Sequence, residues 1–269
     1  MRYVKYVFLV ILLLFFTACG EKRKLKIAAN PWIGYVPLFY LQKSGELKNF
    51  EIIKTSSLKE SLNFFDTGIV DAMAATNYEQ KKAVVKVFPV IYLDKSYGGD
   101  VVMANFNFKE INKKKKINVY LEYNSVNSIL FNAFVKKFNF PKNKFIINDK
   151  YQYQILNMKK FQPDSLIVTY VPFNKEFERK NFKTVFSTKT EENIIIDAIF
   201  ADCKTIKTYK NEFRSLYLKI QKVIKLIKQK PLKVYEKIKS YFPKDYTFED
   251  FMKDLGNIKW ILKFKGSCG

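Results

Sequence analysis

The residues best suited to chemistry are polar and aromatic side chains that follow an apolar run, and they offer hydrogen bonding and flat contact surfaces. Asn30, Trp32 and Tyr35 come soon after the apolar run at 25–29, at a break made by Pro31. Proline cannot donate a hydrogen bond to a sheet and moves the preceding residue out of helical geometry. In an open α/β sheet, ligands bind beyond the carboxyl ends of strands, where the next helix begins with unpaired N–H groups. We therefore expect a ligand near these residues.

Two pairs of short polar residues stand at other predicted strand ends. Thr76 and Asn77 follow the small-residue run at 72–75. Asn124 and Ser125 follow a strand predicted at 117–121 and precede a predicted helix. Small side chains at a strand end permit close approach of a ligand. Two plainer interpretations stay open: Trp32 and Tyr35 as core aromatics, and Asn124 and Ser125 as a simple helix cap.

The sequence holds no recognisable catalytic set. Histidine is absent, which removes the usual general base near neutral pH and the commonest metal ligand. There is no phosphate-binding loop, no glycine-rich dinucleotide motif and no paired-cysteine metal motif. We expect a binding protein rather than an enzyme, with no catalytic residue, no metal and no cofactor.

Two β-α-β-α-β units in series position the candidate residues. The pattern predicts an α/β protein of two similar lobes joined by a hinge. A crossover at 103–106 and a return near 192–196 would insert the second lobe into the first. The expected limits are 25–103 plus 195–269 for lobe one and 104–194 for lobe two, with helices at about 205–229, 231–241 and 248–264.

The first residues resemble an export signal. Arg2 and Lys5 precede a ten-residue apolar stretch at 7–16, which is too short for a membrane span of about 20 residues. Small residues before Cys19 resemble the bacterial lipoprotein box, with Phe16 in place of the usual leucine. We expect a signal peptide at 1–18, a lipidated Cys19 and a tether at 19–24. A plain signal peptide or an uncleaved anchor is the alternative.

The chain carries a formal net charge of +23, and a nucleic-acid footprint is one interpretation of it. Lysine recurs in every segment, however, and an exported protein does not meet chromosomal DNA, so we expect no nucleic-acid partner. Cys203 and Cys268 either form a disulfide in an oxidising compartment or remain buried thiols.

A collinear set of motifs resembles the periplasmic solute-binding proteins of ABC importers of the nitrate/sulfonate/taurine type, with the SsuA/THI5-like (NMT1-like) domain. The segment at 30–38 is similar to that family's N-P-W-x-G-Y-x-P opening, 68–72 to its G-x-x-D-A turn, 94–100 to its D-x-S-x-G-A-D segment, and 123–127 to its G-S-V-S loop. Tyr170-Val171-Pro172 resembles Y-E-P, although Val171 replaces the acid, and the 109–118 linker lacks the family's glycine.

The resemblance implies a type II periplasmic binding fold that closes on a ligand between its lobes. It implies binding roles for nine residues. Trp32 and Tyr35 would wall the pocket, Thr76 and Asn77 would hydrogen-bond the ligand, Ser96 and Asp100 would line the lobe-one side, Asn124 and Ser125 with helix N–H groups would hold an anionic or polar end, and Tyr170 would close the far side.

The implied function is a membrane-anchored lipoprotein on the periplasmic side of the envelope. It would capture a sulfonate-, amine- or pyrimidine-like solute and pass it to an ABC permease and its ATPase. We expect a monomer. The alternative is a ligand sensor that reports to a membrane signalling protein.

Overall fold

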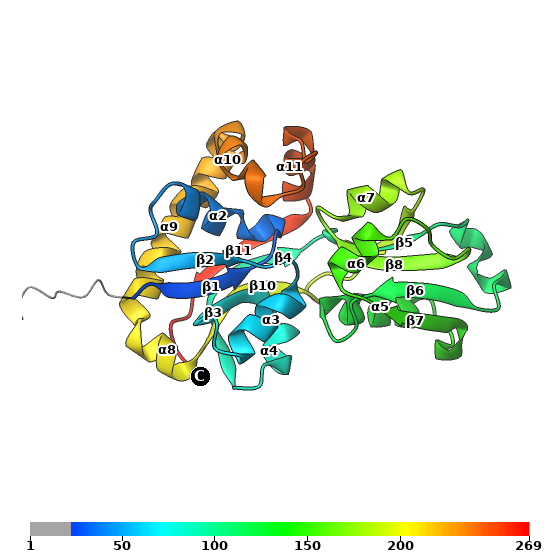
Figure 1. Cartoon of the computed structure of the whole chain (residues 1–269), viewed down its shortest axis with the longest axis horizontal. Helices are drawn as coiled ribbons and strands as arrows, with labels where there is room; N and C mark the ends of the chain where they lie inside the picture. Colours follow the sequence, from blue (N-terminus) through cyan, green and yellow to red (C-terminus); the bar gives the residue numbers. More distant parts are fainter. Residues whose placement is uncertain (1–22, 269) are drawn as a thin grey trace, which may run out of the picture.

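The computed structural model describes residues 23–268, which form two α/β bodies lying side by side, each built on its own sheet (Figure 1). The prediction of two α/β lobes, with the second inserted in the first, is confirmed, because the chain leaves the first sheet and later returns to it. The predicted signal peptide and the predicted lipidation site at Cys19 lie outside the described residues.

The first sheet contains six strands of the described part of the chain. In spatial order they are β11 (Ile258–Phe264), β4 (Val87–Ser96), β10 (Ile196–Asp202), β3 (Ala72–Thr76), β1 (Leu25–Ala29) and β2 (Phe50–Lys54). β1 runs parallel to β2 and β3, whereas β10 is antiparallel to both β3 and β4. The sequence of β3, AMAAT, is buried along its whole length, as expected for a central strand covered on both faces.

The second sheet repeats this arrangement with five described strands. They are β7 (Phe145–Asp149), β6 (Ile117–Leu121), β8 (Ser165–Tyr170), β5 (Asp100–Ala104) and β9 (Lys183–Ser187). β6 is parallel to β7 and β8, and β5 is antiparallel to β8. In each sheet, therefore, three parallel strands lie side by side, and the next strand in space is antiparallel to them. That strand is β10 in the first sheet and β5 in the second.

The first crossover lies earlier in the chain than predicted. β5 pairs with β8 and β9, so the chain has already left the first sheet between Ser96 and Asp100. The predicted limit at residue 103 assigned most of β5 to lobe one. The five residues of β5 are all buried and would suit a central strand of either sheet, so its composition does not reveal its partner. The remaining lobe limits stay proposals.

Helices cover the faces of both sheets (Figure 1). Those of the first lobe are η1 (Ile33–Tyr35), α2 (Val36–Lys43), α3 (Leu58–Asp66), α4 (Glu79–Lys82), α8 (Cys203–Thr208), α9 (Lys210–Gln229), α10 (Pro231–Ile238), η4 (Lys239–Tyr241) and α11 (Phe248–Leu255). Those of the second are η2 (Phe108–Lys113), α5 (Val126–Lys137), η3 (Lys142–Lys144), α6 (Gln152–Asn157) and α7 (Asn174–Arg179). No helix within residues 23–268 is long and apolar enough to cross a bilayer.

The C-terminal part differs from the prediction of a helix through residue 264. Helix α11 ends at Leu255, and Ile258–Phe264 forms β11 at the edge of the first sheet. Gly256 and Asn257 separate the two elements, and β11 pairs antiparallel with β4. Only part of β11 is buried, and its apolar residues follow one another closely enough to suit either a helix or a strand.

The structure resolves the open question about the cysteines. Cys203 at the start of α8 and Cys268 near the end of the chain form a disulfide, with their Cα atoms 5.6 Å apart. The bond joins the segment after β11 to the helix that follows β10.

Candidate functional site

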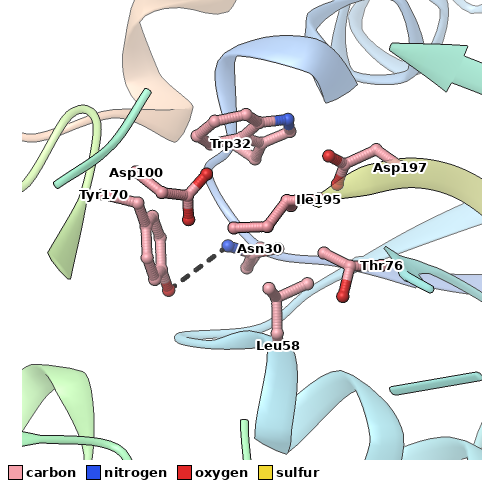
Figure 2. A pocket seen from close by; sticks show the side chains of 8 residues that line it. All are labelled: Asn30, Trp32, Leu58, Thr76, Asp100, Tyr170, Ile195 and Asp197. Carbon is pink, nitrogen blue, oxygen red and sulfur yellow. Dashed lines mark hydrogen bonds between the residues drawn. The ribbon is translucent and has the colours of Figure 1, made fainter. Parts of the chain in front are cut away.

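A small cavity lies between the two lobes, where strands of both sheets end. It measures about 10 Å³, which is room for about one water molecule. It is lined by Asn30, Trp32, Leu58, Thr76, Asp100, Tyr170, Ile195 and Asp197. Figure 2 shows Asp100 and Tyr170, from the second sheet, on one side and Asp197, from the first sheet, on the other. Both lobes therefore contribute to the site.

Two aromatic side chains form part of the cavity wall. The rings of Trp32 and Tyr170 meet edge to face, with centroids 6.2 Å apart, and they are only 4% and 2% exposed. The Trp32 indole donates a hydrogen bond of 3.2 Å to Asp94. Gly99 permits this packing, because a Cβ at that position would lie 2.5 Å from the Trp32 ring. The predicted positions of Trp32 and Tyr170 thus agree with the cavity.

Tyr35 lies behind the cavity rather than in its wall. Its ring is fully buried, and its hydroxyl donates a hydrogen bond of 2.6 Å to Asp197. The structure places Tyr35 in the core, outside the cavity lining, and its predicted contact with a ligand stays a prediction. Tyr35 orients the Asp197 carboxyl, which does line the cavity.

Asn77 and Ser96 hold the crossing segments and are absent from the cavity lining. The Asn77 side chain bonds the backbone of Ile194 and Ile196, where the chain returns to the first sheet. Ser96 shares a hydrogen bond of 2.7 Å with Thr188 and accepts another from the Asp100 backbone. Both side chains are fully engaged in positioning the connections between the lobes.

The start of α5 differs most from the prediction. Its Val126 N–H donates a hydrogen bond of 3.1 Å to Glu79, which comes from the first lobe, and its Asn127 N–H donates to the Ser125 hydroxyl. Asn124 is exposed and adopts a left-handed backbone with φ of 57°. The helix start predicted to hold an anionic or polar ligand end is thus occupied by a carboxyl group of the protein itself.

Five buried carboxyl groups lie at or near the cavity. They are Glu79, Asp94, Asp100, Glu122 and Asp197. Burial raises the pKa of Asp94 to about 8 and that of Asp100 to about 7. Burial likewise raises the pKa of Glu122 to about 7 and that of Asp197 well above its usual range. The charged form of each is disfavoured because water is excluded.

Several oxygens around the cavity lack a hydrogen-bond partner. They are Oδ1 of Asn30 and the Oδ2 atoms of Asp94, Asp100 and Asp197, each buried. Asp94 and Asp197 are register partners on the adjacent strands β4 and β10. Buried polar atoms are normally paired, so an unpaired group of this kind indicates a missing partner.

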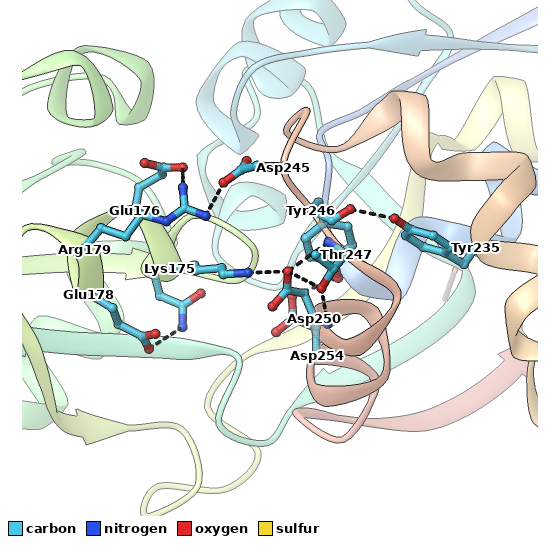
Figure 3. Close-up of polar contacts among 11 residues, drawn as sticks. Lys175, Glu176, Glu178, Arg179, Tyr235, Asp245, Tyr246, Thr247, Asp250 and Asp254 are labelled. Atoms are coloured by element: carbon cyan, nitrogen blue, oxygen red, sulfur yellow. Dashed lines mark hydrogen bonds and ion pairs between the residues drawn. The ribbon is translucent and has the colours of Figure 1, made fainter.

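Hydrogen bonds and ion pairs join the lobes around the cavity. Ser57 donates to Glu122 at 3.1 Å, and the Asn30 amide donates to the Tyr170 hydroxyl at 3.4 Å. On another side, Figure 3 shows Lys175 paired with Asp250, and Arg179 paired with Asp245. The structure therefore represents the lobes in a closed arrangement.

Reasoning from sequence missed four lining residues: Asn30, Leu58, Ile195 and Asp197. The sequence places Asn30 near the expected ligand but indicates no role for it. Asp197 carried a usable signal, because a lone acid inside the apolar run of 194–201 is costly to bury without a purpose. Leu58 and Ile195 offered no signal beyond their apolar character. Within residues 23–268, no set of three or more histidine, cysteine or acidic residues is arranged to hold a metal ion.

No protein-family model and no curated protein matches the sequence. Solved structures do match. The aliphatic sulphonate binding protein SsuA from Escherichia coli has a TM-score of 0.72 at 10% identity, covering 90% of this chain and 86% of that chain. SsuA from Xanthomonas axonopodis pv. citri, bound to MOPS, has a TM-score of 0.73 at 8% identity, covering 91% and 88%.

A ligand-binding component of an ABC-type import system from Staphylococcus aureus, with zinc bound, is also similar. Its TM-score is 0.71 at 12% identity, covering 88% of this chain and 85% of that chain. The resemblance found in the sequence is thus supported over nearly the whole described chain. At these identities the likeness establishes the fold, and the chain has the two-lobed fold of the periplasmic binding proteins that serve ABC importers.

Proposed function

We propose that this protein is a lipid-anchored solute-binding protein that encloses a small organic solute between its lobes and delivers it to an ABC importer. The observation that carries the proposal is the cavity lined from both lobes, three of whose lining residues, Asn30, Asp100 and Asp197, have a buried oxygen without a hydrogen-bond partner. Such a site suits a ligand that hydrogen-bonds residues of both lobes and so holds the lobes together.

Solute entry requires the lobes to separate, because the closed cavity has room for about one water molecule only. The hinge consists of the two crossing segments, 97–99 and the stretch that leads into β10. Gly98, with φ of 107°, supplies a backbone conformation in the first segment that other residues rarely adopt. On closure, the Ser57–Glu122 and Glu79–Val126 hydrogen bonds would re-form.

The anchor belongs to the proposal as well. Lipidation of Cys19 would leave a tether of a few residues before β1, so the first lobe would be held at the periplasmic face of a membrane. The expected partners are a permease and its ATPase, and the expected state is a monomer. Two of the similar structures are named for sulphonate or alkanesulfonate binding, which keeps sulfonates among the solutes to be tested.

The protein would bind its solute without transforming it. The absence of histidine from the sequence supports this proposal, since no general base with an ordinary pKa near 7 is present. The buried carboxyls are instead placed where they can contact a ligand.

Tryptophan fluorescence offers a direct test, because the chain has two tryptophans and one of them lines the cavity. Trp260→Phe leaves Trp32 as the only indole. Titration with sulfonates, amines, nitrate and pyrimidines should then change its emission for one class and raise the melting temperature. Trp32→Ala should weaken that solute's binding at least tenfold, whereas Trp260→Phe alone should not. If no solute class alters either signal, the proposed function is wrong.

A further inference from the structure

The unpaired atoms at the cavity all have the same hydrogen-bonding character. Asn30 Oδ1 and the Oδ2 atoms of Asp100 and Asp197 are oxygens of lining residues, and these residues are between 0% and 4% exposed. An amide oxygen and an ionised carboxyl accept hydrogen bonds, whereas a protonated carboxyl also carries one O–H donor. A partner that presents donors would pair the Asn30 oxygen and favour the ionised form of the carboxyls. A sulfonate presents acceptors only, so it would leave the Asn30 oxygen unpaired and would require the carboxyls to stay protonated.

The cavity also contains no positive charge to receive an anion. Among its lining residues, all within the described part of the chain, none is lysine or arginine. The charged groups that act on Asp94, Asp100 and Asp197 are other carboxyls. Glu122, further out, has Lys59 among its charged neighbours. An anion placed here would find no cationic partner in the lining and would further disfavour ionisation of these carboxyls, in a medium that screens charge poorly.

The helix start predicted to hold an anionic or polar ligand end is already occupied. Glu79 accepts hydrogen bonds from the Val126 N–H at the start of α5 and from Thr76. This arrangement uses the positive end of the helix to stabilise a carboxyl of the protein. An incoming anionic head group would have to displace Glu79, which is 1% exposed.

Aromatic faces complete the environment. Trp32 and Tyr170 line the same cavity as Asp100 and Asp197. Indole and phenol rings attract cations through the negative potential of their faces. Rings and carboxyls therefore favour the same kind of ligand.

We propose that the solute is a small organic cation whose protonated nitrogen carries N–H groups, and that Asp100, Asp197 and Asn30 accept hydrogen bonds from it. This inference rests on the proposed function, since it names the ligand class of the same site. The ammonium or guanidinium head would lie between Asp100 of the second lobe and Asp197 of the first, so that binding closes the lobes. Tyr35 and Ser96 act as positioning residues through their bonds to Asp197 and to the Asp100 backbone.

A bare metal ion is the competing cation, and the geometry disfavours it. Within residues 23–268, the carboxyls do not converge as a set of three or more potential ligands. They lie on different sides of the cavity, as Figure 2 shows for Asp100 and Asp197. Such spacing suits a head group with several N–H donors pointing in different directions.

A matched series of probes tests the inference on residues 20–269 of the chain. Butylammonium, butanol and butanesulfonate share one alkyl chain and differ in the head group. Methylammonium, benzylammonium and guanidinium vary the size of the cation, and tetramethylammonium keeps the charge without N–H donors. We expect at least one of the N–H cations to bind ten times more tightly than the neutral and anionic analogues and than tetramethylammonium, measured by calorimetry and thermal shift.

The outcomes separate the two proposals. Binding of butanesulfonate or another anion, with no response to any N–H cation, overturns the cation inference and leaves solute binding standing. Equal affinity for tetramethylammonium overturns the role of N–H donors. If every solute class fails, including those used in the fluorescence titration, the proposed function fails together with the inference.

Variants assign the binding to these carboxyls. Asp100→Asn and Asp197→Asn should each weaken binding of the cation at least tenfold. Asp100→Asn should also raise the melting temperature of the ligand-free protein at pH 8, because an amide needs no counter-charge. The matched control is Asp254→Asn. Asp254 is also buried, and burial raises its pKa to about 7, but it lies away from the cavity and bonds Tyr246. Unchanged cation affinity in both cavity variants would overturn the assignment.

Discussion

Two groups of carboxyls lie near the junction of the lobes, and they differ in what they face. Asp245 and Asp250 face Arg179 and Lys175 of the other lobe (Figure 3). The hydrogen bond from Arg179 lowers the pKa of Asp245, and although burial opposes it, the bonds from Lys175 and Thr247 lower the pKa of Asp250. These acids are charged and satisfied by the protein.

The cavity group shows the opposite condition. Asp100 and Asp197 line a cavity whose lining holds no lysine or arginine, Asp94 lies nearby and accepts a hydrogen bond from Trp32, and burial raises the pKa of all three. Leaving carboxyls buried without a counter-charge costs stability, so such an arrangement is expected at a binding site rather than at a structural contact. The ion pairs on one side of the junction stabilise the contact between the lobes. We infer that the unpaired carboxyls on the other side contact the ligand.

The largest expected effect on solute affinity comes from replacing Glu79. Its carboxyl occupies the start of α5, where an anion would otherwise bind. Glu79→Ala removes a charge-assisted hydrogen bond of about 1.5–3 kcal/mol to the start of α5. Affinity for the cationic solute should fall about tenfold to a hundredfold, while measurable affinity for butanesulfonate should appear. Calorimetry with both probes measures the two changes.

Glu79→Gln is the matched control, because its amide oxygen can still accept the Val126 N–H. It should keep the closed arrangement and gain little anion affinity. Wild-type cation affinity in Glu79→Ala, with no response to sulfonate, would show that the helix start has no part in selecting charge.

The pH dependence of stability should reveal the unpaired acids. In the folded, ligand-free protein the pKa of Asp100 is about 7 and that of Asp94 about 8, whereas unfolded aspartates titrate near 4. Between these values the folded state binds more protons, so the free energy of unfolding should decrease as pH rises from about 4 to about 8. Each such group contributes roughly 1.4 kcal/mol per pH unit in that window.

Denaturant unfolding at pH 5, 6, 7 and 8 measures this slope. Asp100→Asn should make it shallower. A ligand-free stability that stays flat or increases over this range would contradict the view that these carboxyls lack partners.

Gly99 connects the hinge to the aromatic wall. A methyl group there would lie 2.5 Å from the Trp32 ring and 3.2 Å from Ser96 Oγ. We expect Gly99→Ala to displace the ring and weaken solute binding by about 1 kcal/mol, the low end of overpacking costs. Gly256→Ala, whose Cβ would meet only a backbone oxygen at 3.2 Å, is the control. Equal affinities in the two variants would mean that the Trp32 ring does not contact the solute.

The smallest effect is expected on the paired side. Lys175→Met removes the partner of Asp250 but leaves its hydrogen bonds to Thr247. Because the Lys175 side chain is 36% exposed, the loss should stay below about 1 kcal/mol and should shrink further at high salt. Solute affinity should change less than twofold. A larger loss of affinity would show that the Lys175–Asp250 ion pair contributes to lobe closure as much as the cavity residues do.

Sequence reasoning identified the fold because alternating strands and helices repeat twice, each time with polar residues at strand ends. It could not assign β5 to its sheet, since five buried residues fit either lobe. It also took β11 for a helix, because pairing with β4 provides strand geometry that the local pattern does not specify.

Part of the cavity lining was predicted for the same reason. Trp32, Thr76, Asp100 and Tyr170 lie next to turns that the sequence marks clearly, and all line the cavity. The occupation of the α5 start by Glu79 joins residues 47 positions apart and depends on how the lobes close, which no local pattern records. The proposed cation site, in place of the anionic or polar contact predicted at the α5 start, follows from that single long-range contact and from the unpaired oxygens.

Proton release on ligand binding tests the central claim most directly. Calorimetry of butylammonium binding at pH 6 and pH 9, in pairs of buffers with different ionisation heats, counts the protons released. Burial and the charge of Glu79 raise the pKa of Asp100, while a hydrogen bond with Ser96 opposes them. Asp94 and Asp197 are neighbours across β4 and β10. Burial also raises the pKa of Glu79, Asp94 and Asp197. A bound cation should ionise at least one of them.

We therefore predict release of about one proton at pH 6, close to none at pH 9, and tighter binding at the higher pH. Binding with no proton release and equal affinity at both pH values, or no binding at either, would contradict the account.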